Sequence, residues 1–229
     1  KYNNDPTDPT KTTTTDVPEI PGYHAEVPNV TPDNPLEDTK VVYVKNTQVI
    51  DLVYVDTKTN TTLTTQNDVA HGDSGSTIPT SVTDTLNSTI QSYLDKGYVI
   101  DPDKVSGTVP DTFDFSDQAA NGADKEHQVV TIYLTHGTVT VTGNDPKTPG
   151  EPINPKDPNG SKYPPEAGKD NLVISSQNII HYYDEAGNKI LDDKVTTDDS
   201  TLTREVTIDK VTSDVISTGK WTGGKEYEN

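Results

Sequence analysis

Residues 49–65 read VIDLVYVDTKTNTTLTT, the most strongly patterned segment in the middle of the chain. Residues 49–55 are β-branched, aliphatic or aromatic except for Asp51, which is the composition of a strand with a buried face. The polar run 57–60 predicts a turn, and Leu63 with its threonine neighbours predicts a return strand. We therefore expect an antiparallel hairpin.

The one clear helix in the sequence is predicted over residues 81–96. Its apolar side chains fall at i, i+4, i+7 and i+8, and Gly97 supplies a left-handed stop; the apolar positions are Leu86, Ile90, Tyr93 and Leu94. Further strands are predicted over 98–100 and 129–134. A hairpin, a crossing helix and further strands together predict a complete β-grasp (ubiquitin-like) domain over 47–140.

The flanking segments predict a second module that is split in two. Residues 141–170 are dense in proline, which predicts a Pro-rich linker of extended, polyproline-like geometry. Residues 171–229 predict strands over 172–183, 189–193 and 202–208 and form the opening half of a second-type β-grasp module. Residues 1–46, with a strand at 40–45, have the features of its closing half. The expected fold class is thus α+β and β-rich, with two β-grasp modules in an elongated repeat.

The two halves are expected to complement each other, because each alone leaves strand edges unpaired. Residues 40–45 would then pair with strands from 171–229. This pairing could arise by fold-back within one chain. It could also arise head to tail between neighbouring chains, which would be a form of self-association.

Composition narrows the class of protein. Hydrophobic residues make up 29% of the chain, which favours two small cores over one large one. Cysteine and methionine are both absent, which excludes disulfides and thiol chemistry. The formal net charge of -19 disfavours nucleic acid and anionic membranes as partners. No apolar run is long enough to insert into a membrane, so we expect any export signal or wall anchor to lie outside this stretch.

Catalytic motifs are missing from the sequence. No metalloprotease, nucleophile-elbow, P-loop or dinucleotide-binding pattern is present, so we predict that the protein is not an enzyme. The histidines are scattered and are interpreted as structural; they are His24, His71, His127, His136 and His181.

Aromatic side chains are the natural candidates for sugar recognition, since the C–H faces of sugars stack on rings. We single out Trp221, Tyr163 and Tyr227 as candidate ligand-binding residues. The alternative is a structural role, with Tyr54, Tyr93 and Tyr133 half-buried in the first core and Trp221 filling the second.

No cofactor is predicted, and calcium is the one metal that the sequence raises. Asp111, Asp114 and Asp117 could offer oxygen ligands, but they lack the spacing of an EF-hand. A solvated acidic loop is the competing interpretation. The turn at 184–188 could also hold a cation, although its sequence is ordinary for a hairpin.

Several segments together resemble the mucus-binding (MucBP or MUB) repeats of lactobacillus cell-surface proteins. Those of the first module are LVYVDTKTNTTL (52–63), HGDSGSTI (71–78), IQSYLDKGYVI (90–100) and HQVVTIYLTHGTV (127–139). The spacer TPGEPINPKDPNGSKYP (148–164) is similar as well. Those of the second module are IIHYYDEAGNKI (179–190), REVTIDKVTSDVISTGKWTGG (204–224) and VPEIPGYHAEV (17–27). In the family order, the last of these would follow the other two.

The resemblance implies an extracellular, LPXTG-type adhesin on the cell wall of a Gram-positive bacterium, whose repeats bind mucin glycoprotein. It also implies immunoglobulin binding by some repeats, which an exposed β-edge could provide. A passive stalk spacer is the remaining alternative.

Charge leads to a first prediction, because mucin is itself anionic. Binding to mucin should strengthen as the pH falls from about 7 toward about 4–5, since protonation of carboxylates reduces repulsion. Adhesion to immobilised mucin, measured across this range with circular dichroism as the control for folding, tests it. A flat or falling curve with an intact fold would contradict the prediction.

Overall fold

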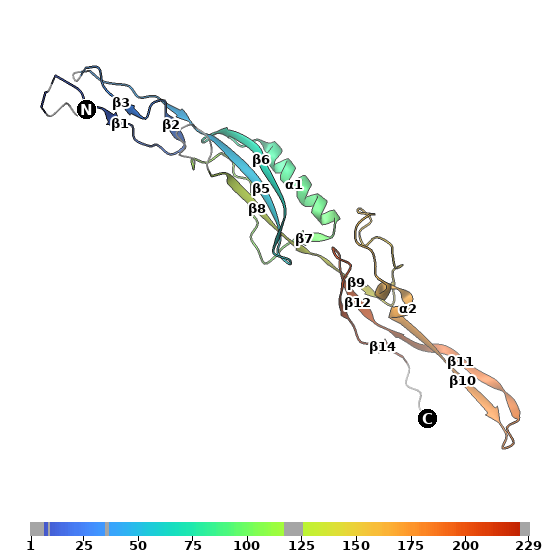
Figure 1. Ribbon diagram of the computed structural model, residues 1–229. Coiled ribbons are helices and arrows are strands. Elements are labelled where there is room, and N and C mark those ends of the chain that lie inside the picture. The colour runs from blue at the N-terminus through green and yellow to red at the C-terminus, as the bar shows by residue number, and fades with distance from the viewer. Residues whose placement is uncertain (1–6, 9, 35–36, 117–125, 225–229) are drawn as a thin grey trace. The chain divides into compact units, whose positions relative to one another are not determined.

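The computed structural model describes residues 7–8, 10–34, 37–116 and 126–224. The chain divides into two compact units, the first comprising 1–90 and 100–134 and the second 91–99 and 135–229. Both units are rich in strands, and the described residues contain few helices (Figure 1). None of the helices in this described part is long and apolar enough to cross a membrane.

A mixed four-stranded sheet has the order β6-β5-β8-β7, and β5, β6 and most of β8 belong to the first unit. Strands β5 (Thr47–Asp56) and β6 (Thr61–Asp73) form the predicted hairpin, and β5 runs parallel to β8 (Gln128–His136). Strand β7 (Tyr98–Ile100) lies where it was predicted. In the hairpin turn, the Asp56 carboxylate accepts the backbone N–H of Lys58 at 2.9 Å.

The core of this sheet follows the alternation of its strands. Ile50, Leu52 and Tyr54 of β5 are each 0% exposed, since every second residue points to the same face. Their buried neighbours on β8 are Val130, Ile132 and Leu134. Helix α1 (Thr80–Asp95) confirms the predicted helix and runs alongside the sheet (Figure 1). Of its apolar face, Val82, Leu86 and Tyr93 are buried, whereas Ile90 and Leu94 are half-buried.

Two short ribbons precede the sheet. Strand β1 (Thr15–Asp16) pairs with β3 (Asn29–Val30), and β2 (Tyr23–Ala25) pairs with β4 (Tyr43–Lys45). The expectation that residues 40–45 pair with strands from 171–229 is therefore wrong for the fold-back form. The physical reason is that a partner about twenty residues away costs less loop-closure entropy than one on the far side of the chain.

The second unit contains two three-stranded sheets. The first has the order β13-β12-β9 and the second β10-β11-β14. Their strands are β9 (Thr138–Thr142), β10 (Val173–Tyr183), β11 (Lys189–Thr203), β12 (Glu205–Asp209), β13 (Val215–Thr218) and β14 (Thr222–Gly223). Because β9 pairs with β12 along its whole length, the border expected at residue 140 falls inside a strand.

The Pro-rich segment is folded, which corrects the expectation of an extended linker over 141–170. Ile153 and Ala167 are 7% and 0% exposed and belong to a buried cluster with Val141, Leu172, Val206 and Ile208. Within the segment, Pro152 and Lys162 form an isolated antiparallel β-bridge. Toward the end of the segment lie η1 (Pro165–Ala167) and α2 (Lys169–Leu172). Apolar residues between the prolines thus pack with the residues of β9 and β12 in this cluster.

Burial of α1 gives a stability prediction. Leu86→Ala should lower the free energy of unfolding by about 2–5 kcal/mol, because it leaves a cavity beneath the helix. Thr83→Ala, at an exposed position of the same helix, should change it by less than about 0.5 kcal/mol. Urea denaturation of both variants measures the difference, and equal effects would show that Leu86 does not contact the core.

Candidate functional site

The only arginine and the only tryptophan of the sequence lie against each other in the second unit. Arg204 links the end of β11 to β12, and Trp221 directly precedes β14. Strand β14 pairs back onto β11, with Leu202 opposite Gly223 and Thr203 opposite Thr222. This register brings the Arg204 guanidinium over the indole ring, 4.6 Å from its centroid, which is cation–π geometry.

Hydrogen bonds on three sides hold Arg204 in place. Its Nε–H donates to the carbonyl of Asn171 at 2.7 Å, and its backbone N–H donates to that of Leu172 at 3.1 Å. Its own carbonyl accepts the N–H of Gly143 at 3.1 Å. A side chain at Gly143 would not fit, since a Cβ there would lie 2.7 Å from the Leu172 carbonyl. The guanidinium is thus preorganised, with one of its five donors used by Asn171.

A hollow of about 430 Å³ opens beside this pair and is referred to here as the basic pocket. Its lining combines hydroxyls, glycines and three charged residues; the lining residues are Thr142, Gly143, Asn144, Thr203, Arg204, Glu205, Gly219, Lys220 and Thr222. Trp221 lies between Lys220 and Thr222 in the sequence, and its ring stacks against Arg204. Among the described residues of this lining, two cations face one carboxylate, which gives that lining a net positive charge in a chain of net charge -19.

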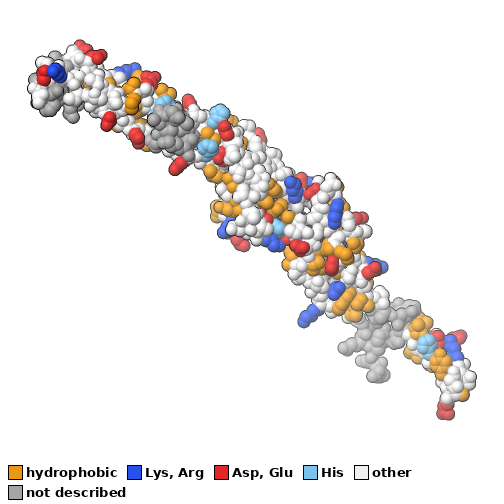
Figure 2. Space-filling model, in the orientation of Figure 1, with side chains coloured by type: hydrophobic (Ala, Val, Ile, Leu, Met, Phe, Trp, Pro, Cys, Tyr) orange, Lys and Arg blue, Asp and Glu red, His pale blue; other side chains and the backbone are white. Residues whose placement is uncertain are grey.

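Acidic side chains are spread over the surface elsewhere. Figure 2 shows red carboxylate groups on both units of the face in view, with the blue cations scattered among them. Against this background, a guanidinium, an ammonium and several hydroxyls around one hollow favour a ligand that carries a carboxylate or sulfate beside hydroxyl groups.

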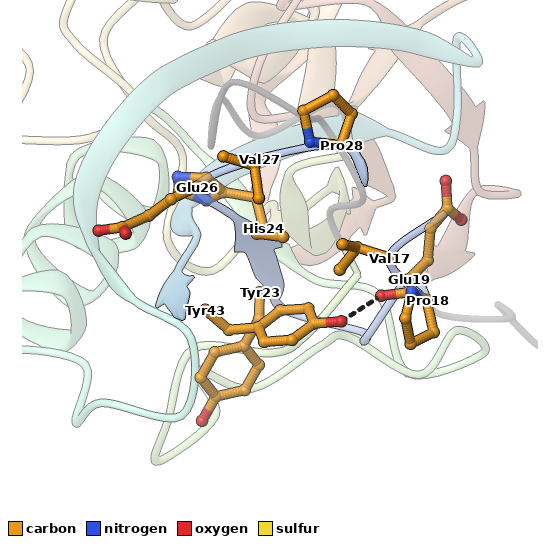
Figure 3. Close-up of a pocket in the computed structure, with 10 residues that line it drawn as sticks. Val17, Pro18, Glu19, Tyr23, His24, Glu26, Val27, Pro28 and Tyr43 are labelled. Carbon is orange, nitrogen blue, oxygen red and sulfur yellow. Dashed lines mark hydrogen bonds between the residues drawn. The ribbon is translucent and has the colours of Figure 1, made fainter. Parts of the chain in front are cut away.

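A second hollow, of about 330 Å³, lies in the first unit between the strands that precede the main sheet; it is referred to here as the tyrosine pocket (Figure 3). Tyr23 and Tyr43 line one side of it, and apolar residues line much of the rest. Glu19 and Glu26 contribute carboxylates to its lining, and His24 contributes an imidazole.

The three aromatic candidates from the sequence fall in different places. Trp221 stands at the basic pocket and does not belong to the buried cluster of the second unit. Tyr163 packs against that cluster, so its ring contributes to the core. Tyr227 lies outside the described residues. Tyr54 and Tyr93 are buried and Tyr133 is half-buried, which agrees with the structural role expected for them.

Sequence reasoning missed Arg204, Lys220 and both tyrosines of the second hollow. The sequence does contain one signal for Arg204, because it is the single arginine of an acidic chain. The contact between Arg204 and Trp221 depends on the pairing of β11 with β14, which the sequence did not predict.

Of the aspartates raised as calcium ligands, Asp114 has another partner. The Asp114 carboxylate accepts the Ser116 hydroxyl at 3.1 Å, Asp111 is exposed, and Asp117 lies outside the described residues. Among the described residues, no group of three or more acidic or histidine side chains is arranged to hold a metal. At the 184–188 turn, the side chain and backbone of Asn188 donate to Asp184 and lower the pKa of its carboxyl group.

Each histidine has its own acidic or amide partner, and none of them meets another at a shared site. Nδ1 of His24 lies 2.7 Å from the side chain of Asn46. The other four histidines each place Nδ1 near an aspartate carboxylate: His71 near Asp68 (3.0 Å), His127 near Asp51 (2.8 Å), His136 near Asp209 (2.7 Å) and His181 near Asp193 (2.9 Å). The hydrogen bond from His181 lowers the pKa of Asp193. These contacts support the structural interpretation of the histidines.

Comparisons with known proteins give matches over two stretches. Residues 48–136 match the family model of a mucin binding domain, and residues 168–229 match that of a Muc B2-like domain. No curated protein matches the chain.

Two solved structures are similar to the chain. The type 2 repeat of the mucus binding protein MUB from Lactobacillus reuteri is 20% identical with a TM-score of 0.38, over 76% of this chain and 74% of that one. The crystal structure of Mub-RV is 22% identical with a TM-score of 0.43, over 77% of this chain and 72% of that one.

Because Trp221 is the only tryptophan, its fluorescence reports directly on the basic pocket. Arg204→Gln should change the emission intensity, since it removes the cation from the face of the indole. Lys156→Gln makes the same charge change outside the lining and should leave the spectrum unaltered. Identical spectra for all three proteins would show that Arg204 does not stack on Trp221 in solution.

Proposed function

We propose that the chain, which is a mucus-binding repeat, binds mucin glycoprotein as part of an extracellular surface adhesin. Its residues 48–136 match a mucin binding domain and its residues 168–229 match a Muc B2-like domain. The match of residues 48–136 to a mucin binding domain carries this proposal. The adhesin performs no catalysis. Anchoring of the whole protein to a cell wall belongs to the same proposal.

The basic pocket is the proposed contact for the sugar. Mucin glycans end in sialic acid or carry sulfate, and both groups are anionic. The Arg204 guanidinium and the Lys220 ammonium would pair with such a group, while Thr142, Thr203 and Thr222 offer hydroxyls to the sugar ring. The preorganised guanidinium loses little conformational entropy on binding, which supports Arg204 as the principal contact.

The β-grasp assignment of the modules is also part of the proposal. A hairpin, helix α1 and strands β7 and β8 in the order β6-β5-β8-β7 support it for residues 47–136. A role as a passive spacer and immunoglobulin binding through a sheet edge remain predictions that the experiment below separates from mucin binding.

Surface plasmon resonance on immobilised mucin tests the proposed site. Arg204→Gln should weaken binding about tenfold or more, because it removes a charge-assisted pair from a preformed pocket. Lys156→Gln should bind like the unaltered chain, and treatment of the mucin with sialidase and sulfatase should lower binding to the level of Arg204→Gln.

The other outcomes separate the alternatives. Binding that resists both treatments and the Arg204 variant would place the contact elsewhere on the chain. A chain that binds neither mucin nor deglycosylated mucin would contradict mucin binding and leave the spacer. Capture of immunoglobulin by such a chain would instead support the β-edge alternative.

A further inference from the structure

The tyrosine pocket lies outside both family matches, because its lining comes from residues 17–43. In the β2–β4 ribbon Tyr23 pairs with Lys45 and Ala25 pairs with Tyr43. Side chains alternate along a strand, so Tyr23, Ala25 and Tyr43 share one face and the two rings are diagonal neighbours. Figure 3 shows both rings on one side of the hollow, with Val27 and Pro28 opposite.

Hydrogen bonds hold the residues on both sides of the tyrosine pocket in place. The Tyr43 hydroxyl donates to the Pro18 carbonyl at 2.7 Å, so that ring presents its face while its polar end is occupied (Figure 3). The backbone N–H of Val17 donates to the Pro28 carbonyl at 3.0 Å, and that of Glu26 donates to the Val42 carbonyl at 3.1 Å. The hollow is therefore built by the fold on both sides.

Its surface is aromatic and aliphatic, and its charge is negative. Val17, Pro18, Ala25, Val27 and Pro28 supply the aliphatic part, and Val27 is 44% exposed. Figure 3 shows the carboxylates of Glu19 and Glu26 at opposite ends, pointing away from the centre. In the described part of the chain, neither lysine nor arginine lines it. Acidic ligands are thus disfavoured, and a sugar would find few polar groups directed inward.

We propose that the tyrosine pocket binds an extended, proline-rich polypeptide, with a prolyl ring against Tyr23 and Tyr43 and basic residues beside it. Flat aromatic walls suit the polyproline helix, which is extended before binding and so loses little entropy. The two outward carboxylates at the ends would pair with lysine or arginine flanking the prolines. This inference does not depend on sugar binding at the basic pocket.

Nuclear magnetic resonance on the full ¹⁵N-labelled chain tests the proposal, with a peptide of about ten prolines and a lysine at each end as the probe. Saturable shifts are expected at the amides of Tyr23 and Tyr43. Tyr43→Ala should lower the affinity about tenfold or more, whereas Tyr43→Phe should lower it much less, since the ring face remains and only the bond to Pro18 is lost. Arg204→Gln should bind the peptide normally, which separates this site from the basic pocket.

Two further measurements keep the test decisive. Val27→Lys places a positive charge at an exposed position of the rim and should weaken binding even if Tyr43→Ala disturbs the β2–β4 ribbon. A peptide with glutamate in place of lysine should bind more weakly. The proposal is overturned if the lysine peptide shifts no amide of this pocket, or if lactose shifts these amides and the peptide does not.

Discussion

The chain has few apolar side chains with which to fill a core. Only 29% of the residues are hydrophobic, so each unit closes a small core and fixes its strand ends with buried polar groups. Asp56 and Asp209 are 2% and 1% exposed, and each accepts backbone N–H groups from the turn that follows it. Asp209 also lies 2.7 Å from Nδ1 of His136. Because buried polar groups are costly without partners, these contacts define the turns as firmly as packing would.

The same polar composition shapes the electrostatics of binding. A net charge of -19 repels an anionic glycan at long range, yet surface charges act over only about 8 Å at physiological ionic strength. Within that distance, a ligand in the basic pocket experiences Arg204 and Lys220 more strongly than the distant carboxylates. Net charge therefore governs solubility and the rate of encounter, and the local arrangement of Arg204, Lys220 and Glu205 governs what is held.

Composition and spacing explain which elements the sequence could predict. The hairpin of β5 and β6 and helix α1 were predicted because the β-branched and apolar composition of 49–55 and the spacing of Leu86 and Tyr93 each suit one structure. The 141–170 segment differs from the expected spacer because Ile153 and Ala167, two apolar residues between its prolines, fill the second core. The predicted partner of β4 was wrong because strands of three residues, such as β2 and β4, are too short for their sequence to indicate which strand they pair with. At the candidate site, Trp221 was predicted from its chemistry alone. Arg204 was not, since their contact arises from strand pairing.

The two pockets differ in the chemistry that they favour, and this difference bears on how weak contacts could add up. The basic pocket offers cations and hydroxyls, whereas the tyrosine pocket offers ring faces bordered by carboxylates. A glycoprotein presents both kinds of group, acidic sugars on its glycans and proline-rich stretches of polypeptide between them. Each pocket is small and open, so each contact alone should be weak. Linking them on one chain, and repeating the chain along an adhesin, turns every later contact into an intramolecular one and raises avidity without any new interaction. Specificity for a glycoprotein over a free sugar or a bare peptide would then come from the combination, because neither partner alone occupies both sites.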